Sequence, residues 1–219
     1  MKTSTKDRII EASREYFNQH GFGGSTLYKL SQSMGISRGN LTYHFKDKEE
    51  LFTIHLEELV EKSTKSFTNS FLIPSWETLR STSKDFMQVQ KDYSYIFFDR
   101  QMLFRDEVLE KIKAIREKHI SIQMSMIHVS IESGNMKSES MPGLYLNSSR
   151  VIWKILFFHL VDHRFSNDQT ISWDKLMWSL LLPHFTKKGI RSFQDHFGIE
   201  YFESLGMSYD SYMKDQVSF

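Results

Sequence analysis

The sequence predicts an all-α fold, and three observations support this prediction. The only prolines among the 219 residues stand at positions 74, 142 and 183, and no glycine lies between Gly39 and Gly134. The apolar positions of residues 8–20 follow helical spacing. Because sheet-rich folds need frequent turn residues, long stretches without helix breakers favour helices. The chain length fits one large or two small domains.

Composition narrows the class of protein. Apolar residues make up 40% and aromatic residues 14% of the chain, which suffices for a buried core and argues against disorder. The chain has no cysteine, so disulfides, cysteine-ligated zinc and thiol catalysis are excluded. The polar N-terminal residues lack the apolar stretch of a secretory signal, and the most apolar segment, 151–161, is too short to span a membrane. We therefore expect a cytoplasmic protein with no membrane partner.

Capping and stop residues near the N-terminus predict a series of short helices. The helix over 8–20 is followed by Gly21, which can supply a left-handed stop. Thr26 precedes a helix of about two turns that ends before Gly35. Ser37 then caps a third short helix.

The third helix is expected over 38–45, and a fourth follows at once. Leu41 and Phe45 stand at spacing i, i+4 and point inward. Asp47 caps the fourth helix, and Glu50 occupies its third position as in a capping box.

The turn between the second and third helices matches the helix-turn-helix signature. Gly35 can take the positive φ, Ile36 fills the angle between the helices, and Ser37 caps the helix that follows. A helical hairpin without a DNA-binding role shares these features, so the turn alone leaves both interpretations open.

A dense series of residues stands in one register over about the first 60 positions. It comprises Ile9, Ile10, Ala12, Tyr16, Phe17, 20–22, 25–27, Leu30, 34–37, 39–41 and 43–51. This series resembles the TetR/AcrR family of bacterial transcriptional regulators. The resemblance implies a helix-turn-helix DNA-binding domain over 1–50, linked by the fourth helix from about residue 47 to a helical ligand-binding and dimerisation domain over 51–219.

Three positions depart from the usual pattern of this family. Ser31 replaces alanine and is small enough for the same packing. Asn40 replaces threonine and Thr42 replaces tyrosine. Both lie on the face expected to meet DNA, so they suggest a different operator preference.

The third helix has small or polar residues on its outward face, as a recognition helix in the major groove requires. Arg38 can read guanine or pair with a phosphate, and Asn40 can contact adenine or cap the helix. Thr42 can touch a thymine methyl or a phosphate, and Gly39 permits close approach to the duplex. Ser37 opens this predicted DNA-contacting segment.

Further DNA contacts are expected beside this helix. Tyr43 and His44 resemble the family's backbone-contacting pair, although packing against the fourth helix also explains them. Lys48 lies in a first helical turn, where a cation is unfavourable unless an anion such as phosphate approaches. Thr26 can donate to phosphate or simply cap the second helix, and Tyr28 is exposed by periodicity.

The formal charge of +1 is the sum of two regions of opposite net charge. Residues 1–48 contain eight basic and four acidic residues, giving +4, and the remainder carries −3. Such a distribution is expected when only one domain faces phosphates.

Beyond the fourth helix, which is expected to end near 67, Pro74 marks a break. Further helices are expected over 76–92, 107–132, 147–165 and 173–188, with an aromatic region at 93–104 and a tail, 198–219, that either packs as a helix or does not. The helices over 147–165 and 173–188 are apolar on most sides and need cover on most sides. The resemblance implies that a second subunit covers them in a homodimer. The predicted interface residues are Phe158, Val161, Trp173, Met177, Leu180 and Leu181.

The resemblance also implies a pocket for an unidentified, apolar small-molecule effector. Its candidate walls are Phe97, Phe98, Met102, Met124, His128, Trp153 and Phe157. Aromatic and methionine residues are also ordinary core residues, and that alternative stays open for each. An effector must bind the DNA-incompetent arrangement more tightly, because equal affinity shifts no equilibrium.

His159 and His163 form the one pattern typical of a metal site, at spacing i, i+4. The glutamate of the zinc-protease motif is missing, and an interface helix explains the pair more simply. We therefore expect no metal, no cofactor and no catalysis, but a DNA-binding regulator, most often a repressor by resemblance. The alternatives are a ligand- or metal-binding enzyme with a degenerate helix-turn-helix, and a DNA-binding module without an effector.

Overall fold

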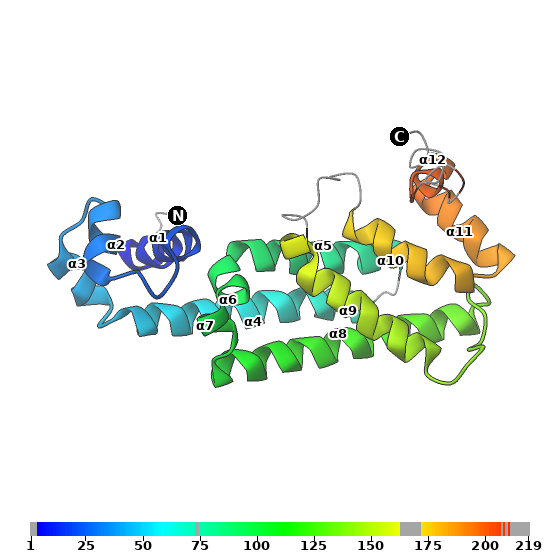
Figure 1. Ribbon diagram of the computed structural model, residues 1–219, viewed down its shortest axis with the longest axis horizontal. Helices are drawn as coiled ribbons and strands as arrows, with labels where there is room; N and C mark the ends of the chain where they lie inside the picture. Colours follow the sequence, from blue (N-terminus) through cyan, green and yellow to red (C-terminus); the bar gives the residue numbers. More distant parts are fainter. Residues whose placement is uncertain (1–3, 73–74, 163–171, 207, 209, 211–219) are drawn as a thin grey trace. The chain divides into compact units, whose positions relative to one another are not determined.

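The computed structural model describes residues 4–72, 75–162, 172–206, 208 and 210, and its regular secondary structure is helical (Figure 1). This confirms the predicted fold class. Within the described ranges, every helix is too short or too polar to cross a bilayer. The elements are α1 (Thr5–His20), α2 (Leu27–Ser33), α3 (Arg38–His44), α4 (Lys48–Leu72), α5 (Trp76–Asp92), α6 (Ser94–Phe98), α7 (Arg100–Leu103), α8 (Asp106–Glu132), α9 (Leu144–Asp162), α10 (Trp173–Leu181), a 3-10 turn (Leu182–His184), α11 (Lys187–Phe197) and α12 (Ile199–Glu203).

The chain forms two compact units. Unit 1 comprises Met1–Asn69 and Thr82–Glu117, and unit 2 comprises Ser70–Ser81 and Lys118–Phe219. Helices α5 and α8 therefore each begin in one unit and end in the other. The functional boundary near residue 50 stays a prediction.

The first three helices of unit 1 follow the predicted capping pattern. Gly21 ends α1 with φ of 72°, and its N–H donates to the Phe17 carbonyl at 2.9 Å. Gly35 takes φ of 65° in the turn between α2 and α3. The Ser37 hydroxyl accepts from the Asn40 N–H at 3.1 Å and so starts α3. Local chemistry thus sets the bounds of the short helices.

A buried histidine joins three helices of unit 1. One ring nitrogen of His55, on α4, lies 3.0 Å from the Ile10 carbonyl and 3.3 Å from the Ser13 hydroxyl, both on α1. The other lies 3.0 Å from the hydroxyl of Tyr95 on α6. Desolvation lowers the pKa of His55 to about 4. The neutral ring therefore ties α1 to α4 and α6 at pH 7.

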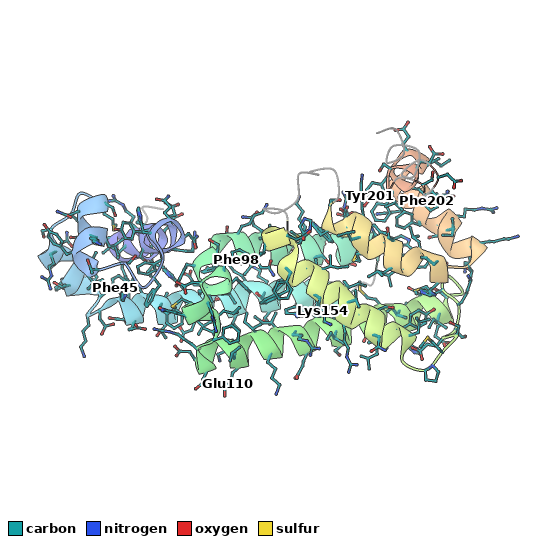
Figure 2. The ribbon with its side chains drawn as sticks, in the orientation of Figure 1. Phe45, Phe98, Glu110, Lys154, Tyr201 and Phe202 are labelled. Carbon is teal, nitrogen blue, oxygen red and sulfur yellow. The ribbon has the colours of Figure 1, made fainter. Side chains whose placement is uncertain are left out.

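Unit 2 has a core of aromatic rings around Trp178. The rings of Trp76 and Phe193 approach Trp178 edge to face, at centroid distances of 5.8 and 5.0 Å. Tyr201, labelled with Phe202 in Figure 2, donates to the Asp174 carboxylate at 2.6 Å and so attaches α12 to α10. The first part of the tail thus packs as a helix.

The prediction of one helix over 173–188 is wrong. The α-helix ends at Leu181, because Pro183 lacks the N–H that would continue it and its ring clashes with the preceding turn. The chain passes through the 3-10 turn, and Thr186 caps α11. The last residues of the helix predicted over 147–165, from 163 onward, lie outside the described residues.

A short antiparallel pairing fastens the start of α11 to the loop after α8. The Lys137 N–H donates to the His184 carbonyl at 2.9 Å, and the Thr186 N–H donates to the Asn135 carbonyl at 2.9 Å. Gly189 packs so closely against the Asn135 carbonyl that a Cβ at this position would overlap it.

We predict that Gly189→Ala lowers the free energy of unfolding by about 3 kcal/mol, because the added methyl must displace backbone rather than a flexible side chain. Urea denaturation measures the change. Gly206→Ala is the matched control, since no atom lies within 4 Å of its added Cβ. Equal urea midpoints for the two variants would show that the contact between α11 and the Asn135 carbonyl can shift with little loss of stability.

Two buried histidines predict a pH dependence of stability. The pKa of His55 and that of His119 are each lowered by desolvation from 6.5 to about 4. Between pH 6.5 and about 4, these histidines bind protons in the unfolded chain but not in the folded chain. Their contribution to stability is therefore full above pH 6.5 and is lost as the pH falls toward 4. Each ring contributes up to about 1.4 kcal/mol per pH unit.

The measurement is the free energy of unfolding from pH 7.5 to 4.5. His55→Gln should flatten the slope, whereas the control His128→Gln, at an exposed position, should leave it unchanged. A His55→Gln slope equal to that of the unsubstituted protein would contradict the assignment.

Candidate nucleic-acid interface

Helix α3 separates sharply into a buried and an exposed face. Leu41, and Phe45 just after the helix, are 0% exposed and pack into unit 1, where Figure 2 labels Phe45. Tyr43 is 86% exposed, and Arg38 and Asn40 are exposed beside it. A tyrosine with this exposure does not pack in the core, so its ring and hydroxyl are accessible to a partner.

Seven of the ten predicted DNA-binding residues lie on α3 or at its N-cap, whereas Thr26 and Tyr28 belong to the start of α2 and Lys48 to the start of α4. Thr26, Tyr28, Ser37, Arg38, Gly39, Asn40, Thr42 and Tyr43 are exposed, and His44 and Lys48 are half-buried. The ring of His44 packs edge to face against Tyr43 at 5.1 Å. The contacts of all ten with DNA stay a prediction.

Hydrogen bonds within the helix-turn-helix limit which groups of these side chains are available to bind DNA. The Thr42 hydroxyl donates to the carbonyls of Arg38 and Gly39, at 3.0 and 3.2 Å. Its proton is therefore used internally, and its methyl group is the part left for a partner. The hydroxyls of Thr26 and Ser37 accept from backbone N–H groups, so each keeps its own proton to donate.

Lys48 has a structural contact that the sequence did not reveal. Its ammonium group donates to the Phe22 carbonyl at 2.8 Å and lies 4.4 Å from the centre of the Phe22 ring. The lysine thus holds the loop before α2 against the start of α4. A phosphate contact of Lys48 remains a prediction beside this positioning role.

Arg105 is a second residue that sequence reasoning missed. Its guanidinium binds the Glu49 carboxylate in a bidentate pair at 2.7 and 3.1 Å. It also lies over the rings of Phe22 and Phe52, at 5.3 and 4.6 Å. Glu49 is 56 positions away in the chain, so no local pattern predicts this contact.

Comparison with known proteins identifies this arrangement. The sequence pattern described as "Bacterial regulatory proteins, tetR family" matches residues 9–53. Over these residues the chain matches the TetR family. The match covers α1 to the first turns of α4 and includes the whole exposed face of α3.

Curated proteins similar to this chain are regulators of transcription. The "Probable HTH-type transcriptional regulator YttP" of Bacillus subtilis is 28% identical over 145 residues, which cover 64% of this chain and 69% of YttP. The "HTH-type transcriptional repressor AcnR" of Corynebacterium diphtheriae is 23% identical over 145 residues, covering 58% and 75%. The predicted class, a helix-turn-helix DNA-binding transcription regulator, is confirmed.

The solved structures support the same fold over most of the chain. A TetR-family transcriptional regulator from Marinobacter aquaeolei VT8 superposes with a TM-score of 0.73 at 16% sequence identity. The match covers 87% of this chain and 96% of that protein. The helical region beyond α4 is therefore part of the shared architecture.

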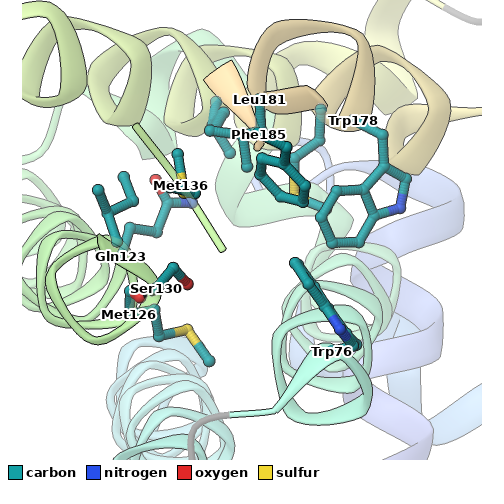
Figure 3. A pocket seen from close by; sticks show the side chains of 11 residues that line it. Trp76, Gln123, Met126, Ser130, Met136, Trp178, Leu181 and Phe185 are labelled. Carbon is teal, nitrogen blue, oxygen red and sulfur yellow. Dashed lines mark hydrogen bonds between the residues drawn. The ribbon is translucent and has the colours of Figure 1, made fainter. Parts of the chain in front are cut away.

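Unit 2 contains a small, apolar cavity (Figure 3). Its volume is about 30 Å³, counted as the space open to the centre of a water molecule. Met136 and Phe185 meet in its wall through the antiparallel pairing after α8. The lining residues are Trp76, Gln123, Met126, Ile127, Ser130, Met136, Ile152, Met177, Trp178, Leu181 and Phe185.

The effector-pocket candidates predicted from the sequence lie elsewhere. Phe97, Phe98 and Met102 belong to unit 1, whereas Met124, His128, Trp153 and Phe157 belong to unit 2. His128 is exposed, and Trp153 is buried beside His119 at a ring distance of 5.5 Å. The cavity of unit 2 is lined by other residues, so the seven candidates stay a prediction.

The predicted interface residues also divide by exposure. Phe158 is 56% exposed, and Val161, Trp173 and Leu180 are half-buried. Met177 and Leu181 are buried within unit 2 and line its cavity. In the described part of the chain, no three histidine, cysteine, aspartate or glutamate residues gather as a metal site, and His163 lies outside that part.

We predict that Lys48→Met lowers the free energy of unfolding by about 1–2 kcal/mol, because the charged bond to the Phe22 carbonyl is lost. Thermal unfolding in the absence of DNA measures this structural role separately from any phosphate contact. Lys46→Met, on an exposed neighbour, is the control. A Lys48→Met protein as stable as the control would leave DNA contact as the residue's only role.

Proposed function

We propose that this protein binds a near-palindromic DNA operator as a homodimer and is released from it by a small, uncharged effector. The single observation that carries the proposal is the polar, exposed face of α3, with Tyr43 held out above a fully buried apolar face. The name of the relative AcnR supports repression as the direction of control. In this proposal the protein acts as a regulator and not as an enzyme.

Each exposed side chain of α3 has a chemical role in this proposal. Arg38 reads guanine through two N–H groups, and Asn40 reads adenine through its amide. Thr42 packs its methyl group on thymine, because its hydroxyl proton is held by the backbone. An added Cβ on Gly39 would meet nothing closer than the Ser37 hydroxyl at 3.9 Å, so the open side of Gly39 is free for the duplex.

The residues around α3 set its register on the duplex through phosphate contacts. Thr26 and Ser37 have hydroxyl protons to donate, and Tyr28 and Tyr43 present exposed phenols. His44 supports Tyr43 by the edge-to-face contact of their rings. Such contacts position the protein without reading sequence.

Dimerisation through α9 and α10 would supply the second recognition helix. Phe158, at 56% exposure, and Val151, at 40%, are large apolar side chains that face outward from α9. The proposed interface consists of these two residues together with Val161, Trp173 and Leu180, which are half-buried in the single chain. Two copies related by a two-fold axis match the two half-sites of a palindrome.

Release by an effector requires that the ligand favour one conformation over another. Helix α5 begins in unit 2 and ends in unit 1, and α8 begins in unit 1 and ends in unit 2. In unit 1, Asn18 of α1 donates to the Asp92 carbonyl at 2.8 Å and accepts from the Tyr95 N–H at 3.1 Å. A change at the ligand end of α5 would thus reach the first helix of the DNA-binding head through these bonds.

We predict that Tyr43→Ala weakens operator binding at least tenfold and leaves the fold intact, because the side chain is exposed. The operator is first selected from random DNA, and affinity is then measured by fluorescence anisotropy at several salt concentrations. The phenol is neutral, and the salt slope follows the number of cationic contacts, so the slope should stay nearly unchanged while the affinity falls.

Phe104→Ala is the matched control, since Phe104 is another exposed aromatic of unit 1 that lies outside the helix-turn-helix. Equal affinities of the two variants would remove Tyr43 from the interface. Failure of the unsubstituted protein to select any sequence would overturn the proposed function itself.

A further inference from the structure

A lysine outside the predicted DNA-binding set lies beside the end of α3. The ammonium group of Lys6, in the first turn of α1, lies 5.7 Å from the centre of the Phe45 ring. Phe45 is 0% exposed and directly follows α3, two residues after the exposed Tyr43. Lys6 itself is exposed, so its charge lies at the surface where α3 ends.

The direction of α1 explains this position. Lys6, Ile9, Ser13 and Phe17 follow one another at helical spacing, and the last three are buried. At the far end of this stripe, the ring of Phe17 packs edge to face on Tyr95 of α6, at 5.4 Å. Helix α1 therefore reaches from α6 to the end of α3, and Lys6 occupies the exposed end of its buried stripe.

The positive charge of Lys6 has no carboxylate within ion-pair distance among the residues that the structure describes. Its neighbour Asp7 completes the capping box of α1, where the carboxylate accepts from the Ser4 N–H at 3.2 Å and from the Ser4 hydroxyl at 2.7 Å. An exposed ammonium group that no carboxylate neutralises is available to an anion of a partner.

The opposite face of α1 differs in charge. Arg8, Glu11 and Glu15 line one surface hollow of unit 1. Because an α-helix turns about 100° per residue, these three positions lie roughly opposite Lys6. Two carboxylates accompany the guanidinium on that face, so the side of α1 that suits a phosphate is the side of Lys6.

The position of Lys6 suits the DNA backbone rather than the base edges. A helix in the major groove is bordered by the phosphates of both strands, and the groove is only about 12 Å wide. A lysine binds phosphate as a point charge on a flexible stem. When the exposed face of α3 enters the groove, an ammonium group beside the end of α3 therefore lies close to the backbone.

We propose that Lys6 binds a phosphate of the DNA backbone next to α3, as a contact that positions the protein and reads no sequence. The inference rests on the proposed function for its partner, double-stranded DNA. Lys6 lies outside the ten contacts predicted from the sequence and outside residues 9–53, which match the family pattern.

The test compares Lys6→Gln with Arg8→Gln, which removes the same charge two residues away on the opposite face of α1. Fluorescence anisotropy measures the affinity for the selected operator at several salt concentrations. Each lost phosphate contact should reduce the slope of log K against log salt by about 0.9, hence by roughly two for a dimer. Arg8→Gln should leave the slope nearly unchanged, and equal slopes for the two variants would overturn the proposal.

Two further measurements separate a phosphate contact from a structural role of Lys6 at Phe45. Lys6→Gln should weaken the operator and a random duplex by the same factor, roughly three- to tenfold for a dimer that loses two contacts. Lys6→Arg keeps the charge and should retain the salt slope. A Lys6→Gln protein that loses its preference for the operator, while its affinity for random DNA is unchanged, would overturn the assignment.

The random duplex also separates this inference from the proposed function. If the protein selects an operator and Lys6→Gln leaves the salt slope unchanged, the phosphate contact is wrong and the regulatory function stands. If it selects no sequence but binds random DNA with a slope that depends on Lys6, the contact stands and the regulatory function is wrong. A folded protein that binds no DNA would overturn both.

Discussion

The DNA-binding head depends on how Phe22 is held. Its ring packs on Phe17, Phe52 and Tyr95, at centroid distances between 5.1 and 6.0 Å, and the cations of Lys48 and Arg105 lie over it. These partners come from α1, α4, α6 and the loop before α8, so one side chain fixes the loop that starts α2 relative to four other segments. Because α2 and α3 share a tight turn, the direction of the exposed face of α3 follows from this contact.

The contrast between the two faces of α3 explains why the helix suits recognition rather than packing. Leu41 and Phe45 anchor the helix to the head, and the backbone bonds of Ser37 and Thr42 stiffen it without using the side chains of Arg38 and Asn40. A rigid helix loses little conformational freedom when it binds. In the proposed complex, Asn40 and Thr42 therefore act through base chemistry rather than through a change in helix shape.

The sequence predicted what local chemistry decides. Gly21, Gly35 and Ser37 set the ends of short helices through contacts within a few residues, and these ends agree with the structure. The prediction of a helix through Pro183 is wrong because the missing N–H of the proline ends the helix although the apolar periodicity continues. The bond between Arg105 and Glu49 and the contact of Lys6 with Phe45 depend on residues brought together only by folding, so no spacing in the chain could reveal them.

The short pairing after α8 gives the cavity an unusual support in a helical protein. Met136 and Phe185 line the cavity, and the backbone bonds of Lys137 and Thr186 flank the bridge that joins them. Occupancy of the cavity and closure of this pairing are therefore thermodynamically linked, since a ligand that binds only the closed form stabilises it by mass action. The amide hydrogens of Lys137 and Thr186 would exchange with solvent more slowly as the cavity fills, which makes this pairing a reporter of ligand binding.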